Sequence, residues 1–441
     1  MDYTGGTVEA DHLCVLVHGL WGNPNHMAQI AKSLRAKHSA NKLYLLLAKR
    51  NSGSFTYDGI ERGGERVCAE IEEELRLIEE KGGKITKLSI VGYSLGGLVS
   101  RYAVGLLHSK GILDTVECMN FVTFASPHLG VRTPLRGWHN HLWNVLGART
   151  LSMSGRQLFT IDNFRDTGRP LLAVLADPNS IFLAGLKRFK RRTLYTNIVN
   201  DKSAVHYTTG ITKTDPYTNL DNLKVNYLQG YEDVILDPKH PVAPRPKVDG
   251  PATFSSVATA GVKWIKRIPL IAAITVFVPI GIVAFLFNSV IQTMRSSKRI
   301  QLYEKGLSGV PIEEYRGPLW MKEIREEVEH VYETLNSSQD QEYLGTETDD
   351  DDLDAQEMDR STTQLLARER RMSIPSQPTL ALAPYQFQMI QNLDSVGWNK
   401  YHVWIHKDRH SHAAIIVRWE KKSFGEGRVV LRHWLDEEFV I

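Results

Sequence analysis

The most informative string in this sequence is Leu88-Ser89-Ile90-Val91-Gly92-Tyr93-Ser94-Leu95-Gly96-Gly97. An apolar, partly β-branched run leads into the pattern Gly-x-Ser-x-Gly, and a helix-forming stretch follows from Leu98 to Leu107. This context is typical of a nucleophile elbow, a strained strand-to-helix turn that exposes a serine hydroxyl above the sheet. Gly92 and Gly96 fit the turn because side chains there would collide with the neighbouring strand and helix. The string therefore predicts Ser94 as a nucleophile.

Predicted strands and helices alternate on both sides of this turn. The strands are expected at Leu13 to Val17, Lys42 to Ala48, Glu117 to Phe124 and Thr193 to Asn200, and an amphipathic helix at Glu61 to Glu80. Such alternation favours a mostly parallel, doubly wound sheet whose chemistry lies at the carboxyl ends of the strands. Together with the elbow, it predicts an α/β-hydrolase fold, with residues 1–237 as the N-terminal part of the domain.

The rest of the chain is predicted to add three kinds of segment to this fold. The irregular region of about 131–192 is expected to form a lid over the active site. Residues 238–267 are predicted to form a linker, and the acidic residues 340–375 a disordered one. Trp398 to Ile405 alternates and Ala413 to Trp419 is strongly apolar, so two further strands are expected there. Residues 384–441 are therefore predicted to complete the hydrolase domain.

Residues 268–291 contain no charged side chain and are long enough for a membrane-embedded helix. Basic residues flank both ends, which favours the same, cytosolic side for each flank. Pro279 and Gly281 near the middle would allow a kink or a hairpin. Ser94 precedes this segment and the candidate catalytic histidines follow it, so a single crossing would separate them. The prediction is monotopic insertion into a membrane or a lipid droplet, with a buried core helix as the alternative.

Composition narrows the class of protein further. The net charge of +3 over 441 residues argues against nucleic acid as the main partner. The three cysteines lie far apart without metal-ligand spacing, which indicates free thiols in a reducing compartment. The N-terminal residues are polar and lack an apolar signal region, so secretion is not expected.

A serine nucleophile needs a base within hydrogen-bond reach and an acid that orients the base. In this fold the chain order is Ser, then Asp or Glu, then His. Asp201 is the favoured acid because it directly follows a predicted strand. The competing carboxylates are Asp215, Asp233 and Asp237.

The favoured base is His412, which lies at the end of a loop between two apolar segments. His410 is its rival. The other histidines considered are His402 and His406 in the same stretch, and His206 and His240 shortly after the acid.

The oxyanion hole should consist of two backbone amides placed where negative charge develops. One is the amide of Leu95, directly after the nucleophile. The other comes from the turn after the first strand, from Leu20 or alternatively from Trp21. This chemistry needs no metal and no organic cofactor.

Four strings carry a resemblance to a known family: His18-Gly19-Leu20-Trp21-Gly22, Gly92-Tyr93-Ser94-Leu95-Gly96-Gly97, Ser126-Pro127-His128-Leu129-Gly130 and Asn200-Asp201. Together they resemble the eukaryotic putative serine esterase family of lipases. The uncharged segment and the string His410-Ser411-His412-Ala413 are similar to its fungal branch, which includes a lipid-droplet phospholipase. The resemblance implies an intracellular lipid hydrolase of broad glycerophospholipid specificity, acting on the cytosolic face of a lipid droplet or of the endoplasmic reticulum.

Two other readings stay open at this point. The same acyl-enzyme chemistry serves hydrolases of triacylglycerol, sterol esters or thioesters, and acyltransferases. From a different class, the chain could be a catalytically inactive, membrane-anchored scaffold. A complete set of Ser94, Asp201 and His412 argues against the scaffold, because a strained serine turn serves no purpose there.

Overall fold

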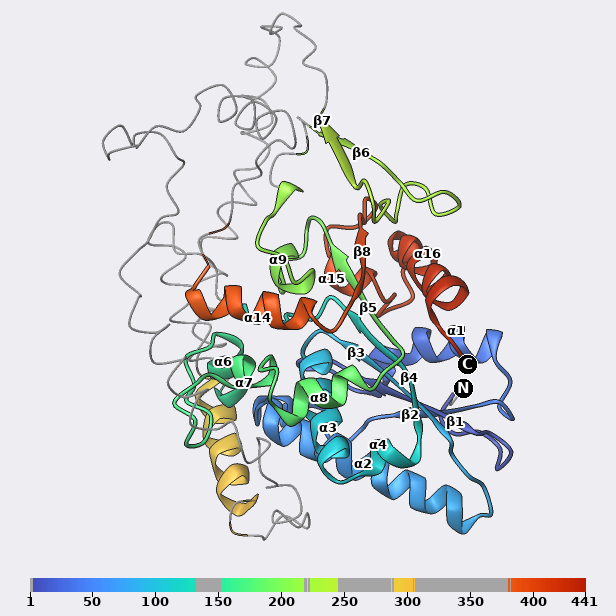
Figure 1. Ribbon diagram of the computed structural model, residues 1–441, viewed down its shortest axis with the longest axis vertical. Coiled ribbons are helices and arrows are strands. Elements are labelled where there is room, and N and C mark those ends of the chain that lie inside the picture. The colour runs from blue at the N-terminus through green and yellow to red at the C-terminus, as the bar shows by residue number, and fades with distance from the viewer. Residues whose placement is uncertain are drawn as a thin grey trace, which may run out of the picture.

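Six strands form one parallel sheet in the order β2-β1-β3-β4-β5-β8 (Figure 1). Their bounds are β1 (His12–Val17), β2 (Leu43–Leu47), β3 (Lys87–Tyr93), β4 (Glu117–Phe124), β5 (Arg191–Asn197) and β8 (Asn399–Val403). The structure is a computed structural model and describes residues 3–131, 152–217, 220, 223–244, 287, 289–303, 305, 380 and 382–441. β8 follows β5 by about two hundred residues of sequence, yet pairs with it directly. The C-terminal residues therefore complete the sheet that the N-terminal residues begin.

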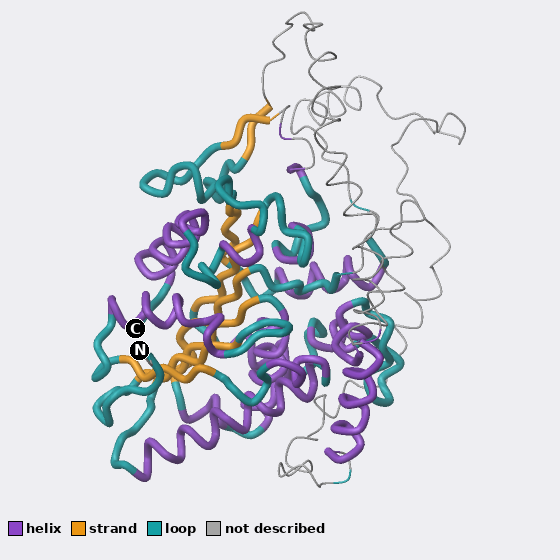
Figure 2. Tube along the Cα trace, turned by 180° about the vertical axis from the view of Figure 1, so that it is seen from behind, coloured by secondary structure: helices purple, strands orange, loops and turns teal. Residues whose placement is uncertain are grey.

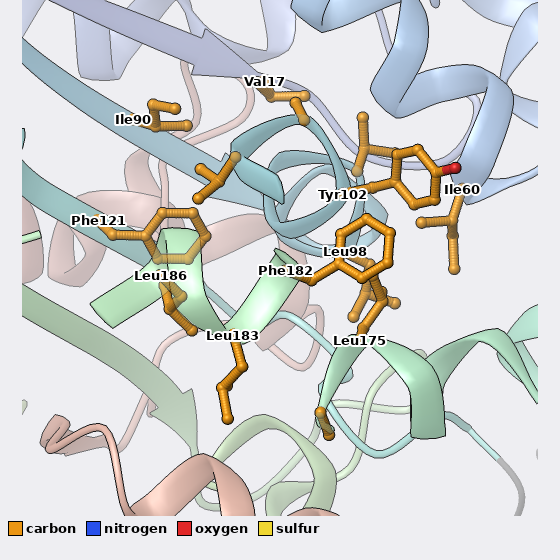
Figure 3. Packing of buried hydrophobic residues seen from close by; sticks show 14 of the residues in the cluster. Val17, Ile60, Ile90, Leu98, Tyr102, Phe121, Leu175, Phe182, Leu183 and Leu186 are labelled. Atoms are coloured by element: carbon orange, nitrogen blue, oxygen red, sulfur yellow. The ribbon is translucent and has the colours of Figure 1, made fainter. Parts of the chain in front are cut away.

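Helices cover both faces of this sheet (Figures 1 and 2). One face carries α2 (Ile60–Glu80), α3 (Leu95–Ser109) and α8 (Ile181–Lys187), and the other carries α1 (Ala28–Lys37) and α16 (Gly425–His433). Alternate residues of each buried strand feed the two cores, so in β1 Leu13 and Val15 face the first group of helices while Cys14 and Leu16 face the second. In the first core Phe182 of α8 lies against Tyr102 of α3, with ring centroids 4.8 Å apart (Figure 3).

Further elements connect these layers. They are η1 (Pro24–Met27), η2 (Gly53–Tyr57), α4 (Ile112–Thr115), α6 (Ser152–Leu158), α7 (Leu171–Leu175), α9 (His206–Thr209), α14 (Pro384–Asp394), α15 (Ser411–Ala414), η5 (Lys422–Phe424) and η6 (Trp434–Glu438). A small antiparallel pair, β6 (Leu223–Val225) and β7 (Val242–Pro244), lies apart from the main sheet. A further helix spans residues 289–303.

The α/β-hydrolase fold predicted from the sequence is confirmed. The sheet has six parallel strands, and the elbow string forms the end of β3, the turn at Ser94 and the start of α3. All three cysteines are free, as the sequence predicts, and all three are buried.

The strand predicted at Ala413 to Trp419 is wrong. This segment begins as α15 and continues in tight turns, with the Val417 amide donating to the Ala414 carbonyl at 3.0 Å. Its residues Ile415 and Ile416 are fully buried against α16 and the sheet. A short continuous apolar run is found in buried turns as well as in buried strands, so the pattern of apolar residues could not distinguish a turn from a strand here.

Several predicted segments reach beyond the described residues. The predicted lid, 131–192, contains α6 and the crossover helices α7 and α8, and its residues 132–151 lie outside the described residues. Residues 238–244 of the predicted linker 238–267 are described and include β7, and the remaining linker residues lie outside the described ranges. All of 340–375 also lies outside them, as does 268–291 except residues 287 and 289–291. None of the described helices has the length and apolar character that crossing a membrane requires.

Candidate active site

Ser94 lies in the sharp turn between β3 and α3. Its backbone angles are φ 54° and ψ −127°, a region that a residue with a side chain rarely occupies. The turn is tight because a Cβ on Gly96 would lie 2.2 Å from the Val17 carbonyl oxygen, and one on Gly92 would lie 2.4 Å from the Gly97 Cα. Both positions exclude any side chain, and the strained turn presents the Ser94 hydroxyl at the carboxyl end of the sheet.

Ser94, His412 and Asp201 form one continuous hydrogen-bonded chain. The Ser94 Oγ lies 2.9 Å from His412 Nε2, and His412 Nδ1 lies 2.8 Å from Asp201 Oδ2. The Asp201 side chain is 2% exposed and that of His412 is 14% exposed, so the contact between them is shielded while the imidazole still reaches the surface. This is the geometry in which a base can take the serine proton and a carboxylate can hold the base.

The loop after β5 aims the Asp201 carboxylate at His412. Asn200 adopts a positive φ of 63°, which turns the chain sharply after the strand. Asp201 Oδ1 accepts the amide hydrogens of Ser203 and Ala204 at 3.0 and 2.8 Å, and Asn197 Nδ2 donates to Oδ2 at 3.0 Å. These three donors fix the orientation of the carboxylate.

Two contacts that the sequence did not reveal hold the histidine segment. Ser411 Oγ donates to the Val199 carbonyl at 2.9 Å, which joins α15 to the Asp201 loop. Tyr93 OH donates to the His412 carbonyl at 2.9 Å, and burial raises the pKa of the Tyr93 phenol well above its usual range, so it remains a donor. The only sequence signal for Tyr93 was its place beside the elbow serine.

The other candidate histidines are placed elsewhere. The rival, His410, is 79% exposed and contacts the Asp408 carboxylate at 3.2 Å through Nδ1. His206 Nε2 and His402 Nδ1 are hydrogen-bonded to each other at 3.0 Å. His406 Nε2 lies 3.3 Å from the Tyr227 hydroxyl, and the His240 carbonyl accepts from Asn226.

The competing carboxylates do not contact His412 either. Asp215 lies 3.6 Å from His206 Nδ1. Asp237 accepts the Lys239 amide hydrogen, and Asp233 adopts a positive φ in the turn that precedes Val234.

Two backbone segments meet at the Ser94 side chain where an oxyanion would form. Leu95 is the first residue of α3, so its amide points out of the helix N-terminus. A Cβ on Gly19 would lie 2.8 Å from the Ser94 Cβ, which places the turn after β1 directly against the nucleophile. In that turn the Trp21 amide already donates to Thr56 Oγ1 at 3.1 Å. This leaves Leu20, rather than Trp21, as the candidate second donor.

The string Ser126-Pro127-His128-Leu129-Gly130 packs beside the nucleophile turn. His128 is fully buried, contacts Thr123 Oγ1 at 3.0 Å through Nε2, and has its pKa lowered well below the usual value by burial. A Cβ on Gly97 would lie 2.1 Å from Ser126 Oγ, so the string packs directly on the start of α3. Its residues shape the elbow and do not extend the hydrogen-bonded chain.

Within the described ranges, no three His, Cys, Asp or Glu side chains gather so that they could hold a metal ion.

Comparison with known proteins gives a family match for the N-terminal part of the chain. Residues 7–214 match the family described as "Putative serine esterase (DUF676)". The "Putative lipase ROG1" of Saccharomyces cerevisiae is 31% identical over 220 residues, which are 48% of this chain and 30% of that protein. The "Putative lipase C4A8.10" of Schizosaccharomyces pombe is 27% identical over 208 residues, or 46% and 26% of the two chains.

The match thus spans less than a third of the length of these two relatives. Among solved structures, carboxyl esterase 2 of the fungus Tuber melanosporum aligns with 43% of this chain and 58% of its own, at 15% identity and a TM-score of 0.28.

Proposed function

Since residues 7–214 match this serine esterase family, we propose that the protein is a serine hydrolase that cleaves acyl esters of glycerophospholipids at a membrane or lipid-droplet surface. The observation that carries the proposal is the continuous contact from Ser94 Oγ through His412 to Asp201 Oδ2. In an α/β sheet of this order, that contact lies at the carboxyl edge, where substrates bind.

Each of the three hydrogen-bonded residues has a defined part in the proposed reaction. Ser94 Oγ attacks the ester carbonyl carbon while His412 Nε2 takes the hydroxyl proton, and Asp201 stabilises the imidazolium that results. The amides of Leu20 and Leu95 donate to the oxyanion of the tetrahedral intermediate. His412 then protonates the leaving alcohol, and water releases the fatty acid from the acyl-serine by the same steps.

The choice of a lipid ester as substrate rests on three observations. Both relatives named above are described as lipases. The sequence holds the uncharged residues 268–291 between basic flanks. At the end of this segment and just beyond it, Phe287, Val290 and Met294 are 68%, 58% and 68% exposed at helical spacing, which offers an apolar stripe to a lipid surface. Basic flanks on both sides favour the cytosolic face of an intracellular membrane, at the endoplasmic reticulum or a lipid droplet.

The proposal is tested by fatty-acid release from emulsions of phospholipid, triacylglycerol and sterol ester. Purified full-length protein is compared with Ser94→Ala and with Ser395→Ala, which removes an exposed hydroxyl at the end of α14. We expect release from phospholipid that disappears in Ser94→Ala and is unchanged in Ser395→Ala.

Other outcomes would redirect the proposal. Serine-dependent release from triacylglycerol or sterol ester alone would keep the mechanism and replace the substrate class. Release from none of the three, together with no reaction of Ser94 with a fluorophosphonate, would favour the scaffold.

A further inference from the structure

A buried carboxylate outside the catalytic chain joins three parts of the molecule. The Asp58 side chain is 0% exposed and accepts hydrogen bonds from Arg66, Ser296 and Arg299. Arg299 binds both carboxylate oxygens, with Nη2 2.7 Å from Oδ1 and Nε 3.0 Å from Oδ2. A bidentate, shielded pair of this kind has a fixed geometry, and breaking it would leave the buried Asp58 carboxylate with Arg66 and Ser296 as its remaining donors.

Through this carboxylate the helix over residues 289–303 is fastened to η2. Arg299 also donates to the Ser54 carbonyl at 2.9 Å, and its guanidinium lies 4.9 Å from the centroid of the Phe55 ring. The helix, yellow in Figure 1, lies next to α6, and Figure 2 shows the same arrangement from behind. α6 adds a further tie, because Ser154 Oγ donates to the Thr56 carbonyl and accepts the Gly59 amide hydrogen. The helix over residues 289–303 and α6 thus both hold η2 in place.

η2 in turn holds the turn after β1, which carries the candidate oxyanion donor Leu20. The Trp21 amide donates to Thr56 Oγ1 at 3.1 Å, and the Trp21 indole donates to the Tyr57 hydroxyl at 2.7 Å. The Gly53 amide donates to the Gly22 carbonyl at 2.8 Å. Trp21 itself has a φ of 55°, which is unfavourable for a residue of its size. A strained conformation persists only where the surroundings fix it, and here η2 supplies the fixing bonds.

We propose that Asp58 is a positioning residue for the oxyanion turn. With Ser296 and Arg299 it fixes η2, and η2 fixes the backbone at Leu20 and Trp21 beside Ser94. The inference rests on the proposed function, since it assigns the turn a part in transition-state binding. The same helix continues the uncharged sequence 268–291, so these contacts also connect the sequence predicted to enter a lipid surface with the active site.

The role predicts a specific kinetic signature. A displaced oxyanion donor weakens binding of the transition state and leaves substrate binding intact, so kcat falls while KM does not change. Complete loss of one donor costs roughly 10²–10³-fold in kcat. Loosening the turn should therefore lower kcat by about tenfold or more, with KM within about twofold of wild type.

The experiment measures two rates on full-length protein in detergent. One is the turnover of a soluble p-nitrophenyl ester, and the other is the reaction of Ser94 with a fluorophosphonate probe. The variants are Arg299→Met and Ser296→Ala, which remove partners of Asp58 and differ in whether a charge is lost. Lys298→Met is the matched control, because Lys298 is an exposed residue of the same helix. Melting temperatures establish that each variant is folded.

We expect Arg299→Met to lower both kcat and the labelling rate at least tenfold, Ser296→Ala to lower them less, and Lys298→Met to leave them unchanged. If the wild type reacts with the probe, and folded Ser296→Ala and Arg299→Met keep its turnover and labelling rates, the positioning role is overturned and the proposed function stands. A loss confined to KM would overturn it as well. Failure of the wild type to react with the probe would instead refute the proposed function, and this inference with it.

Discussion

Replacing Gly96 with alanine should impair catalysis far more than it impairs folding. The added Cβ would lie 2.2 Å from the Val17 carbonyl oxygen and 2.5 Å from that of His18. Cβ contacts below 3.0 Å are essentially never seen, so β1 and α3 would have to separate by about 0.8 Å. Both obstructing atoms are backbone, so no side chain can rotate away to make room.

The size of the effect follows from what these atoms carry. Val17 and His18 lead directly into the turn of Leu20, and Gly96 follows Leu95, so the separation moves the two candidate oxyanion donors apart. A misplacement of about 1 Å in a catalytic group costs on the order of 100-fold in rate. Overpacking of this kind costs about 1–3 kcal/mol in the free energy of unfolding, which a domain with two large cores can tolerate.

The assay compares kcat on a soluble p-nitrophenyl ester with the melting temperature for wild type, Gly96→Ala and Gly425→Ala. A Cβ on Gly425 would meet no atom within 4 Å, and this residue has no positive φ, so it is a glycine-to-alanine control in open space. We expect kcat to fall about 100-fold in Gly96→Ala and to stay at the wild-type value in Gly425→Ala. A folded Gly96→Ala protein with wild-type kcat would refute the reasoning, because it would show that the elbow tolerates the displacement without loss of transition-state binding.

Three further predictions follow from the same structure. Asp201→Asn should lower kcat by about 10⁴-fold, since it leaves the His412 imidazole in the wrong tautomer, whereas Asp215→Asn should keep most of the activity in the same ester assay. His412→Ala should abolish fluorophosphonate labelling and His410→Ala should not, because only the first histidine contacts Ser94; equal labelling of the two variants would contradict the assignment. Burial lowers the pKa of His12 to about 4 in the folded protein, so the unfolded chain binds the extra proton first. As the pH falls from 6.5 toward 4, His12 should therefore lower the free energy of unfolding by up to about 1.4 kcal/mol per pH unit, in addition to what the other buried histidines contribute. In His12→Asn, the free energy of unfolding, measured by denaturant titration at each pH, should depend less steeply on pH.

The elements near the active site could be predicted because each combines a buried run with a turn that only certain residues can form. The strand Glu117 to Phe124 was predicted with its observed bounds. The fold followed from the same signals, since strands that end in such turns alternate with amphipathic helices. The pairing of Asp201 with His412, by contrast, could only be proposed from chain order. The structure brings these two residues within 2.8 Å, and their catalytic roles stay predictions.

Long-range contacts left no trace that a reading of the sequence could detect. Asp58 and Arg299 are separated by 241 positions, and neither belongs to a motif. The ties of Tyr93 and Ser411 to the histidine segment are equally invisible, because a hydroxyl that donates to a distant carbonyl has no preferred local pattern. Contacts of this type depend on how α15, η2 and the helix at 289–303 pack, which is settled by the whole fold rather than by neighbouring residues.

The family match and the hydrolase domain have different extents in this chain. The match covers residues 7–214 and so contains Ser94 and Asp201 without His412. The structure shows that the residues beyond it are part of the same core. β8 pairs with β5, Trp434 is fully buried with its ring edge-on to Phe124, and Asn120 of β4 donates to the Val440 carbonyl at 2.6 Å.

Removing residues 398–441 would therefore expose the edge of β5 and open the face of the sheet that α16 covers, besides removing the histidine. A fragment that ends at residue 214 would lack both a finished core and His412, the proposed base. The proposed catalytic contact and the stability of the fold thus depend on the same C-terminal segment, which explains why the α/β-hydrolase fold of this chain cannot be divided at the boundary of the family match.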